Sequence, residues 1–326
     1  GYTETDTTDA KIIAILVDDE SVESVSEGEC TVILDKTPFY GEGGGQVGDT
    51  GTIYKDGALI NVSDTKKSDG VYLHICTVSN GTFSVGDRVT ADVSDVRRAA
   101  ICRNHSACHL LQASLRRVLG AHIEQAGSYV DEHRVRFDFT HFSALTKEEI
   151  FAVEKLVNAN ILVGNPIIST ETDIESAKKA GAMALFGEKY GKVVRMVKMG
   201  EFSTELCGGT HCANTANIGL FKIISESSAA AGIRRIEAVT GMGVLELIEE
   251  RDALIADTAK VLRSNNVSDM PQRAAALQAE ISDKKQEIDS LNRKLAEMKL
   301  SSIVDDAEEI KGVRLIVSDL GNSGID

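Results

Sequence analysis

The first 96 residues constrain the fold most strongly, because they alternate short β-type runs with glycine turns and show no helical periodicity. The runs at residues 11–17, 31–34 and 70–75 are rich in Val and Ile. Many short strands separated by turns indicate a small antiparallel barrel or a sandwich. Of these two folds, we assign a small antiparallel β-barrel to residues 1–96.

The following region, residues 97–241, mixes helical and strand patterns. Apolar residues at helical spacing predict a helix over 99–119, which Gly120 ends, and a capping box at Thr146 opens a second helix that runs to about residue 160. A third helix is expected near 175–186. Strands are expected in a hairpin over 129–142 and at 166–170, 192–198, 219–225 and 233–240. This pattern predicts an α+β domain with a helix layer against a largely antiparallel sheet.

Residues 242–300 have a helical composition. One amphipathic stretch covers 244–262, and a second helix is expected from Pro271 onward. In that second helix, apolar residues recur at spacings of four and three, as in a heptad seam: Leu277, Ile281, Ile288, Leu291, Leu295 and Met298. We predict an antiparallel helical hairpin that either packs on its own core or serves as a spacer or dimer arm. Residues 301–326 read as the incomplete start of a C-terminal domain, so we expect the chain to be a piece of a longer protein.

The net charge of the chain is −15, which by itself argues against a nucleic-acid partner. The charge is unevenly distributed, however, because residues 97–240 carry 18 basic and 15 acidic side chains, a net +3. Since phosphate contacts depend on local Lys and Arg, this segment remains compatible with salt-sensitive nucleic-acid binding. No apolar run approaches the roughly 18 residues of a membrane span, so we expect no membrane partner.

A set of His and Cys residues has the composition of a metal site. His105 and His109 are four residues apart on one face of a predicted helix, and a Cys-Gly-Gly-Thr-His run carries Cys207 and His211. These are donor types that Zn²⁺ prefers, and Cys212 is an alternative to Cys207. Six cysteines in 326 residues are too few for a disulfide scaffold, which favours a reducing cytoplasm. Ser106 follows the first histidine where zinc proteases carry a catalytic Glu, so that chemistry is not indicated.

A glycine-rich segment over residues 41–51 formally contains G-x-G-x-x-G. A dinucleotide fingerprint must open a helix, whereas this segment runs into a predicted strand at 52–54 and has no Walker lysine. We therefore exclude nucleotide binding here. The glycines are expected to let two backbones approach each other closely.

Four motifs, in order and spacing, resemble the editing region of the alanyl-tRNA synthetase family. They are residues 37–46 (TPFYGEGGGQ), 103–111 (RNHSACHLL), 207–211 (CGGTH) and 232–241 (GIRRIEAVTG). The resemblance covers residues 37–241, and it implies hydrolysis of tRNA(Ala) mischarged with serine or glycine. It further implies zinc held by His105, His109, Cys207 and His211.

The resemblance also assigns pocket roles to Gln125, Ser128 and Arg234, and it places Cys108 where many relatives carry threonine. It puts the ATP-dependent ligase core upstream of this chain, so ligase activity is not expected here. It leaves two other functions open: a freestanding editing protein that acts in trans, and a non-catalytic tRNA-binding module with structural zinc. A homodimer formed through the C-terminal region is a further expectation.

Overall fold

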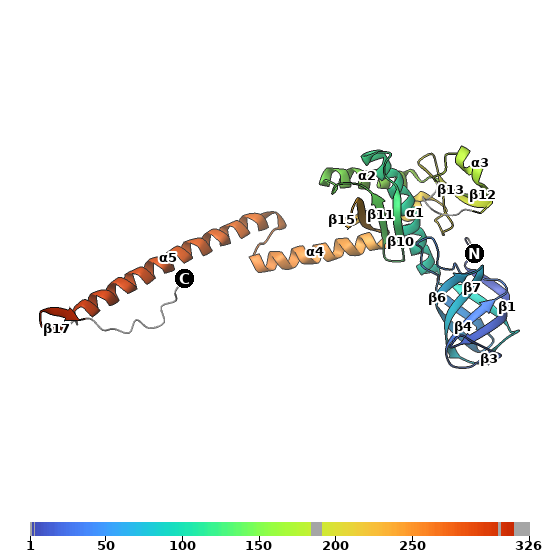
Figure 1. Cartoon of the computed structure of the whole chain (residues 1–326), viewed down its shortest axis with the longest axis horizontal. Helices are drawn as coiled ribbons and strands as arrows, with labels where there is room; N and C mark the ends of the chain where they lie inside the picture. Colours follow the sequence, from blue (N-terminus) through green and yellow to red (C-terminus); the bar gives the residue numbers. More distant parts are fainter. Residues whose placement is uncertain (1, 3, 184–190, 306–307, 316–326) are drawn as a thin grey trace. The chain divides into compact units, whose positions relative to one another are not determined.

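The computed structural model describes residues 2, 4–183, 191–305 and 308–315 (Figure 1). The chain forms two compact units, Gly1–Leu247 and Ile248–Asp326. Within the described residues, no helix combines the length and the apolar character that a membrane span requires. The domain boundaries expected at residues 96, 241 and 300 stay predictions.

The N-terminal part of the first unit is a closed antiparallel barrel of six strands, as predicted (Figure 1). In barrel order the strands are β1 (Asp6–Val17), β4 (Gly28–Leu34), β7 (Val71–Asn80), β6 (Ala58–Ser68), β5 (Gly51–Lys55) and β9 (Arg88–Val93), which pairs again with β1. β2 (Glu20–Val22) extends the sheet beside β1, and β3 (Ser24–Val25) pairs with β8 (Phe83–Ser84). Alternate side chains such as Ile12, Ile53 and Ile60 fill the interior, as the two-residue strand period requires.

The rest of the first unit is α+β, also as predicted. α1 (Asp95–Leu119) and α2 (Lys147–Val163) pack together, and both contact an antiparallel sheet. The order of that sheet is β10 (Gln125–Val130), β11 (Val135–Thr140), β16 (Ile233–Thr240) and β15 (Phe221–Ala230). Leu111, Phe137 and Val153 are fully buried between the two layers. The predicted capping box is confirmed, because the Thr146 side chain accepts a hydrogen bond from the backbone N–H of Glu149 at the start of α2.

A second, three-stranded sheet lies beside these layers. It contains β12 (Ile167–Asp173), β13 (Val193–Met199) and β14 (Ser203–Leu206), with the short helices α3 (Ile174–Lys179) and η1 (Thr215–Ile218) nearby in the chain. The helix expected near 175–186 is wrong in length, because α3 ends at Lys179 and Gly181 follows with a left-handed φ of 79°. Its last three expected residues, 184–186, lie outside the described residues. β14 has no counterpart among the predicted strands.

The glycine-rich segment lies in the connection from β4 to β5 and runs along β10. Its backbone pairs with that strand, since Val130 donates its N–H to Gly45 O at 2.7 Å and Val47 donates to Val130 O at 3.1 Å. A Cβ on Gly45 would lie 2.5 Å from Ser128 O, and Gly45 has a left-handed φ of 81°. The expectation that these glycines permit close backbone approach is therefore confirmed.

The second unit is helical over most of its described length. α4 (Met242–Leu262) runs into it from the first unit, and η2 (Val267–Asp269), α5 (Met270–Asp305), β17 (Glu308–Ile310) and β18 (Val313–Leu315) follow. Both predicted helices are confirmed. Five residues of the heptad seam are exposed in the described part of this unit: Ile281, Ile288, Leu291, Leu295 and Met298. The antiparallel pairing of the two helices stays a prediction.

Candidate metal centre and its pocket

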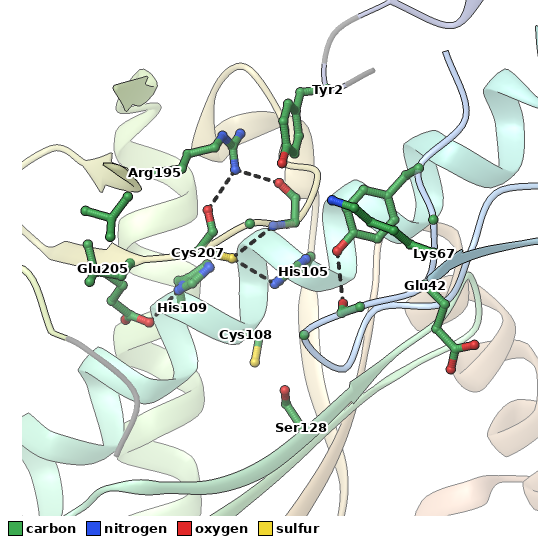
Figure 2. A pocket seen from close by; sticks show the side chains of 18 of the residues that line it. Tyr2, Glu42, Lys67, His105, Cys108, His109, Ser128, Arg195, Glu205 and Cys207 are labelled. Atoms are coloured by element: carbon green, nitrogen blue, oxygen red, sulfur yellow. Dashed lines mark hydrogen bonds and ion pairs between the residues drawn. The ribbon is translucent and has the colours of Figure 1, made fainter. Parts of the chain in front are cut away.

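Four side chains from two distant parts of the sequence meet at one point. His105 and His109 project from α1 toward Cys207, which lies on the segment that follows β14 (Figure 2). His211 lies on the same segment, four residues after Cys207. One donor atom from each residue lies within 4.8 Å of the other three. Cys207 Sγ is 3.4 Å from His105 Nε2 and 3.3 Å from His211 Nε2. The four residues that the sequence nominated are therefore brought together.

Two further side chains fix the orientation of the α1 histidines. His105 Nδ1 lies 2.7 Å from Gln46 Oε1, and His109 Nδ1 lies 2.5 Å from Glu205 Oε2. Because both partners offer acceptor oxygens, each Nδ1 carries the hydrogen and each Nε2 is left to face the cluster. Among the described residues, buried His109 Nε2 has no hydrogen-bond partner, as expected of an atom that binds a metal.

The cluster is strongly coupled electrostatically. Burial alone would raise the pKa of the Cys207 thiol, but the neighbouring imidazoles, His105 first, hold that pKa well below its usual value. Burial would lower the pKa of His109, yet the negative charges of Glu205 and Cys207 raise it to about 10, so a metal ion that binds Nε2 would displace a proton from this imidazole. Burial lowers the pKa of His211 to about 3, so this imidazole stays neutral. A thiolate beside neutral imidazole nitrogen is a donor set that suits a divalent cation.

The spacing of the donors also fits a metal ion. Tetrahedral zinc with Zn–S of about 2.3 Å and Zn–N of about 2.1 Å places sulfur and nitrogen about 3.6 Å apart. The observed separations of 3.3 and 3.4 Å are close to that value. The backbone N–H of Cys212 donates to Ser106 Oγ at 3.0 Å, and its thiol is not among the four converging donors. Cys207 rather than Cys212 is thus the cysteine of the cluster.

A cavity of about 570 Å³ is lined by three of the four donor residues, His105, His109 and Cys207. Gln125 and Ser128 of β10 line it, and Gln125 Nε2 donates a hydrogen bond to Ser128 Oγ at 3.1 Å. Cys108 lines it from α1, and its thiol faces the Ser128 hydroxyl (Figure 2). Burial raises the pKa of Cys108 well above its usual value, so it stays a neutral thiol.

Arg234, the third predicted pocket residue, lies elsewhere. It is on β16, two strands from Gln125, and donates from Nε to Glu226 Oε1 at 2.5 Å. It is not among the described residues that line the cavity. A role for Arg234 in the pocket stays a prediction.

Sequence reasoning missed three residues of the site. Glu205 stands two residues before Cys207, and the alternation of an extended strand could have placed both on one face. Arg195 of β13 donates from Nη1 to the carbonyls of Cys207 at 3.0 Å and Gly209 at 2.7 Å, which holds the Cys207 loop in place. Gln46 lies inside the glycine-rich segment, where no spacing to the histidines signals its contact.

Two family models and several known proteins match the sequence of this chain. Residues 1–97 match the family model of class II (A) tRNA synthetases, and residues 194–237 match the second additional domain of threonyl and alanyl tRNA synthetases. The chain is 48% identical over 320 residues to the alanine–tRNA ligase of Acetivibrio thermocellus, covering 98% of this chain and 36% of that protein. The chain belongs to the alanyl-tRNA synthetase family.

Other members of the family give the same result. The alanine–tRNA ligase of Alkaliphilus oremlandii is 46% identical over 328 residues, which cover 100% of this chain and 37% of that protein. The alanine–tRNA ligase of Bacillus subtilis is 45% identical over 320 residues, which cover 98% of this chain and 36% of that protein. The chain thus spans a little over a third of the length of these relatives.

Proposed function

We propose that this chain is the editing region of an alanyl-tRNA synthetase, which hydrolyses the ester of tRNA(Ala) mischarged with serine or glycine. The observation that carries the proposal is the cluster of His105, His109, Cys207 and His211 at the wall of a cavity lined by Gln125 and Ser128. A metal beside a small polar cavity suits an ester whose acyl group is a small amino acid. We expect the ATP-dependent ligase activity to lie in parts of the family's enzymes that this chain does not cover.

The four converging donors would hold Zn²⁺, which supplies Lewis-acid polarisation of an ester carbonyl or a more acidic water when bound. Four protein donors describe a closed site, so we assign no zinc-bound nucleophile. The residues of the chain hold the donors in place: Glu205 orients His109, and Arg195 clamps the loop of Cys207.

The selectivity for serine over alanine is explained by the polar side chains of Gln125 and Ser128, which line the cavity. An aminoacylation pocket shaped for alanine cannot strongly reject serine, which only adds a hydroxyl. In the editing cavity, Ser128 Oγ accepts from Gln125, which leaves its own proton to donate to the hydroxyl of a seryl group. An alanyl group offers no such partner, so this contact discriminates serine from alanine, and it plays no part in the selection of glycine, which has no hydroxyl.

The substrate would be a tRNA acceptor end. Lys67 and Arg195 line the cavity together with the exposed ring of Tyr2, and the Arg195 guanidinium lies 4.3 Å from the centre of that ring. Cations next to an aromatic ring are suited to phosphate and base contacts. We expect salt-sensitive binding and a cytoplasmic location, and we propose that a homodimer forms through the exposed seam of α5.

Deacylation assays test the function directly. The chain is incubated with seryl-, glycyl- and alanyl-tRNA(Ala), with and without a zinc chelator. We expect hydrolysis of the first two, little hydrolysis of the third, and loss of activity with chelator. Equal rates for all three tRNAs, or no hydrolysis by the zinc-loaded chain, would contradict the proposal.

The second candidate is a non-catalytic tRNA-binding module with structural zinc. The four-donor set favours it, because closed sites are typical of structural zinc. Its signature is zinc-dependent folding and tRNA binding without deacylation. A freestanding protein that edits in trans has the same chemistry as the main proposal, and the intact mass of the native gene product distinguishes the two.

A further inference from the structure

The glycine-rich segment brings a buried amide into contact with the metal cluster. Gln46 is fully buried, although it lies in a loop between two strands of the barrel. Its Oε1 lies 2.7 Å from His105 Nδ1 and accepts the backbone N–H of Thr210 at 2.9 Å, while its Nε2 donates to Thr210 Oγ1 at 3.0 Å. The amide therefore joins a histidine of α1 to the loop that carries Cys207 and His211.

Glycines make room for this contact on both sides. A Cβ on Gly209 would lie 1.9 Å from the ring of His105 and 2.8 Å from Gln46 Oε1. Gly45, next to Gln46, lies against the backbone of Ser128, where a Cβ would be 2.5 Å from the carbonyl oxygen. Neither position has space for a larger side chain. The close packing thus places Gln46 against the imidazole and leaves the amide little freedom to move.

We infer that Gln46 is a positioning residue of the proposed metal site and that the β-barrel thereby sets the metal affinity of the neighbouring domain. The two hydrogen bonds to Thr210 fix which end of the Gln46 amide faces His105. The amide oxygen holds the hydrogen of the imidazole on Nδ1, so Nε2 points at the cluster. Outer partners of this kind orient metal-binding histidines and raise their basicity.

The barrel is well placed to exert this control. The segment that carries Gln46 is held at Asp49, whose carboxylate pairs with Arg98 of α1 and whose carbonyl oxygen accepts a hydrogen bond from Thr65 Oγ1 of β6 at 2.9 Å. It is also held by its backbone hydrogen bonds to Val130 on β10. These anchors connect the same loop to the barrel, to α1 and to the sheet. If the barrel shifts, Gln46 shifts with it and His105 loses its partner.

The inference rests on the proposed metal site, and its test measures metal affinity rather than hydrolysis. Zn²⁺ affinity of the whole chain is measured by competition with a chromophoric chelator, and the absorption spectrum of bound Co²⁺ reports ligand geometry. Gln46→Met keeps the side-chain volume but removes the acceptor, so we expect affinity to fall about 10- to 100-fold with an altered Co²⁺ spectrum. Gln46→Glu retains an acceptor for both N–H groups and is expected to restore affinity to within roughly threefold of wild type.

Gln125→Met is the matched control, because Gln125 lines the same cavity but bonds to Ser128 and none of the four donors. It should leave the metal affinity and the Co²⁺ spectrum unchanged. Wild-type affinity in folded Gln46→Met, or an equal loss in Gln125→Met, overturns the inference.

If Gln46→Met does not fold, Thr210→Val decides the question. This substitution removes only the hydroxyl that anchors the Gln46 amide, and we expect about a three- to tenfold loss of Zn²⁺ affinity. Wild-type affinity in that variant overturns the inference. Deacylation measured on the same preparations separates the two proposals. If the wild-type chain hydrolyses no mischarged tRNA but Gln46→Met still binds Zn²⁺ more weakly than wild type, the result supports the role of Gln46 and contradicts the editing function.

Discussion

The Arg98 guanidinium, near the start of α1, lies against the Asp49 carboxylate on the barrel connection, with Nε 2.9 Å from Oδ1. The two side chains are only 5% and 1% exposed. Arg98 also donates from Nη2 to the carbonyl of Pro38 at 3.0 Å. A buried charge pair with further hydrogen bonds resists separation, because either partner alone would leave an uncompensated charge away from water. This pair fixes the helix that carries His105 and His109 to the barrel that carries Gln46.

Asp49→Asn should therefore lower the free energy of unfolding of the first unit by about 3–5 kcal/mol, since it leaves the Arg98 charge buried without its partner. Urea unfolding followed by circular dichroism measures the change. Asp9→Asn is the control, because the Asp9–Arg88 pair is 69% and 61% exposed and is worth less than about 1 kcal/mol. Similar costs for the two substitutions would contradict the assignment.

Cys207→Ala should abolish stoichiometric zinc binding and lower hydrolysis of seryl-tRNA at least about 100-fold, because it removes the thiolate of the cluster. Metal content by atomic absorption and deacylation rates are measured together. Cys212→Ala should retain zinc, since that thiol is not among the converging donors. Hydrolysis by a metal-free Cys207→Ala chain would show that the reaction does not need the metal.

Ser128→Ala should lower the hydrolysis of seryl-tRNA about tenfold, which corresponds to one lost hydrogen bond to the serine hydroxyl. Hydrolysis of glycyl-tRNA should change little, because glycine has no hydroxyl to bind. The ratio of the two rates is the measurement. Equal effects on both substrates would assign Ser128 to the shape of the cavity rather than to recognition of serine.

The barrel should lose stability in mild acid because of His74. Burial lowers the pKa of His74 to about 4. In the folded barrel, His74 Nδ1 lies 2.8 Å from Val32 O, and His74 Nε2 lies 2.8 Å from Thr37 Oγ1. In the unfolded chain the pKa returns to its ordinary value of 6.5, so between these values unfolding takes up a proton. The contribution of His74 to the free energy of unfolding is therefore complete above pH 6.5 and is lost as the pH falls toward 4. The total loss is roughly 3 kcal/mol.

Unfolding midpoints measured from pH 7.5 to 4 test this prediction. His74→Gln should flatten the pH dependence, whereas His133→Gln should leave it as in the wild type because the His133 side chain is 84% exposed. A slope that is unchanged in His74→Gln would assign the acid sensitivity to other groups.

The sequence predicted those features that depend on local pattern. Alternation and glycine turns indicated the barrel, helical spacing indicated α1, and the four-residue step from His105 to His109 indicated one shared face. The CGGTH run supplied the other two donors. These signals are sufficient to predict the strands, the helix and the donor residues, because each depends only on residue types and spacings within a short stretch of the sequence.

The remaining features depend on tertiary contacts. Gln46 reaches His105 from 59 residues away, through an approach that only the packed barrel creates. Glu205 pairs with His109 across 96 residues, and the two-residue step from Glu205 to Cys207 indicates a shared strand face but not the helix that this face meets. Arg234 was placed in the pocket by resemblance alone, while the structure pairs it with Glu226.

The separation of the four donors along the chain fixes an order of events during synthesis. His105 and His109 leave the ribosome about 100 residues before Cys207 and His211, so for that interval the nascent chain presents only half of the cluster. Gln46 and the barrel emerge earlier still and can be in place before α1 arrives. A metal ion held by all four donors would therefore mark the moment at which α1 has met the segment that follows β14.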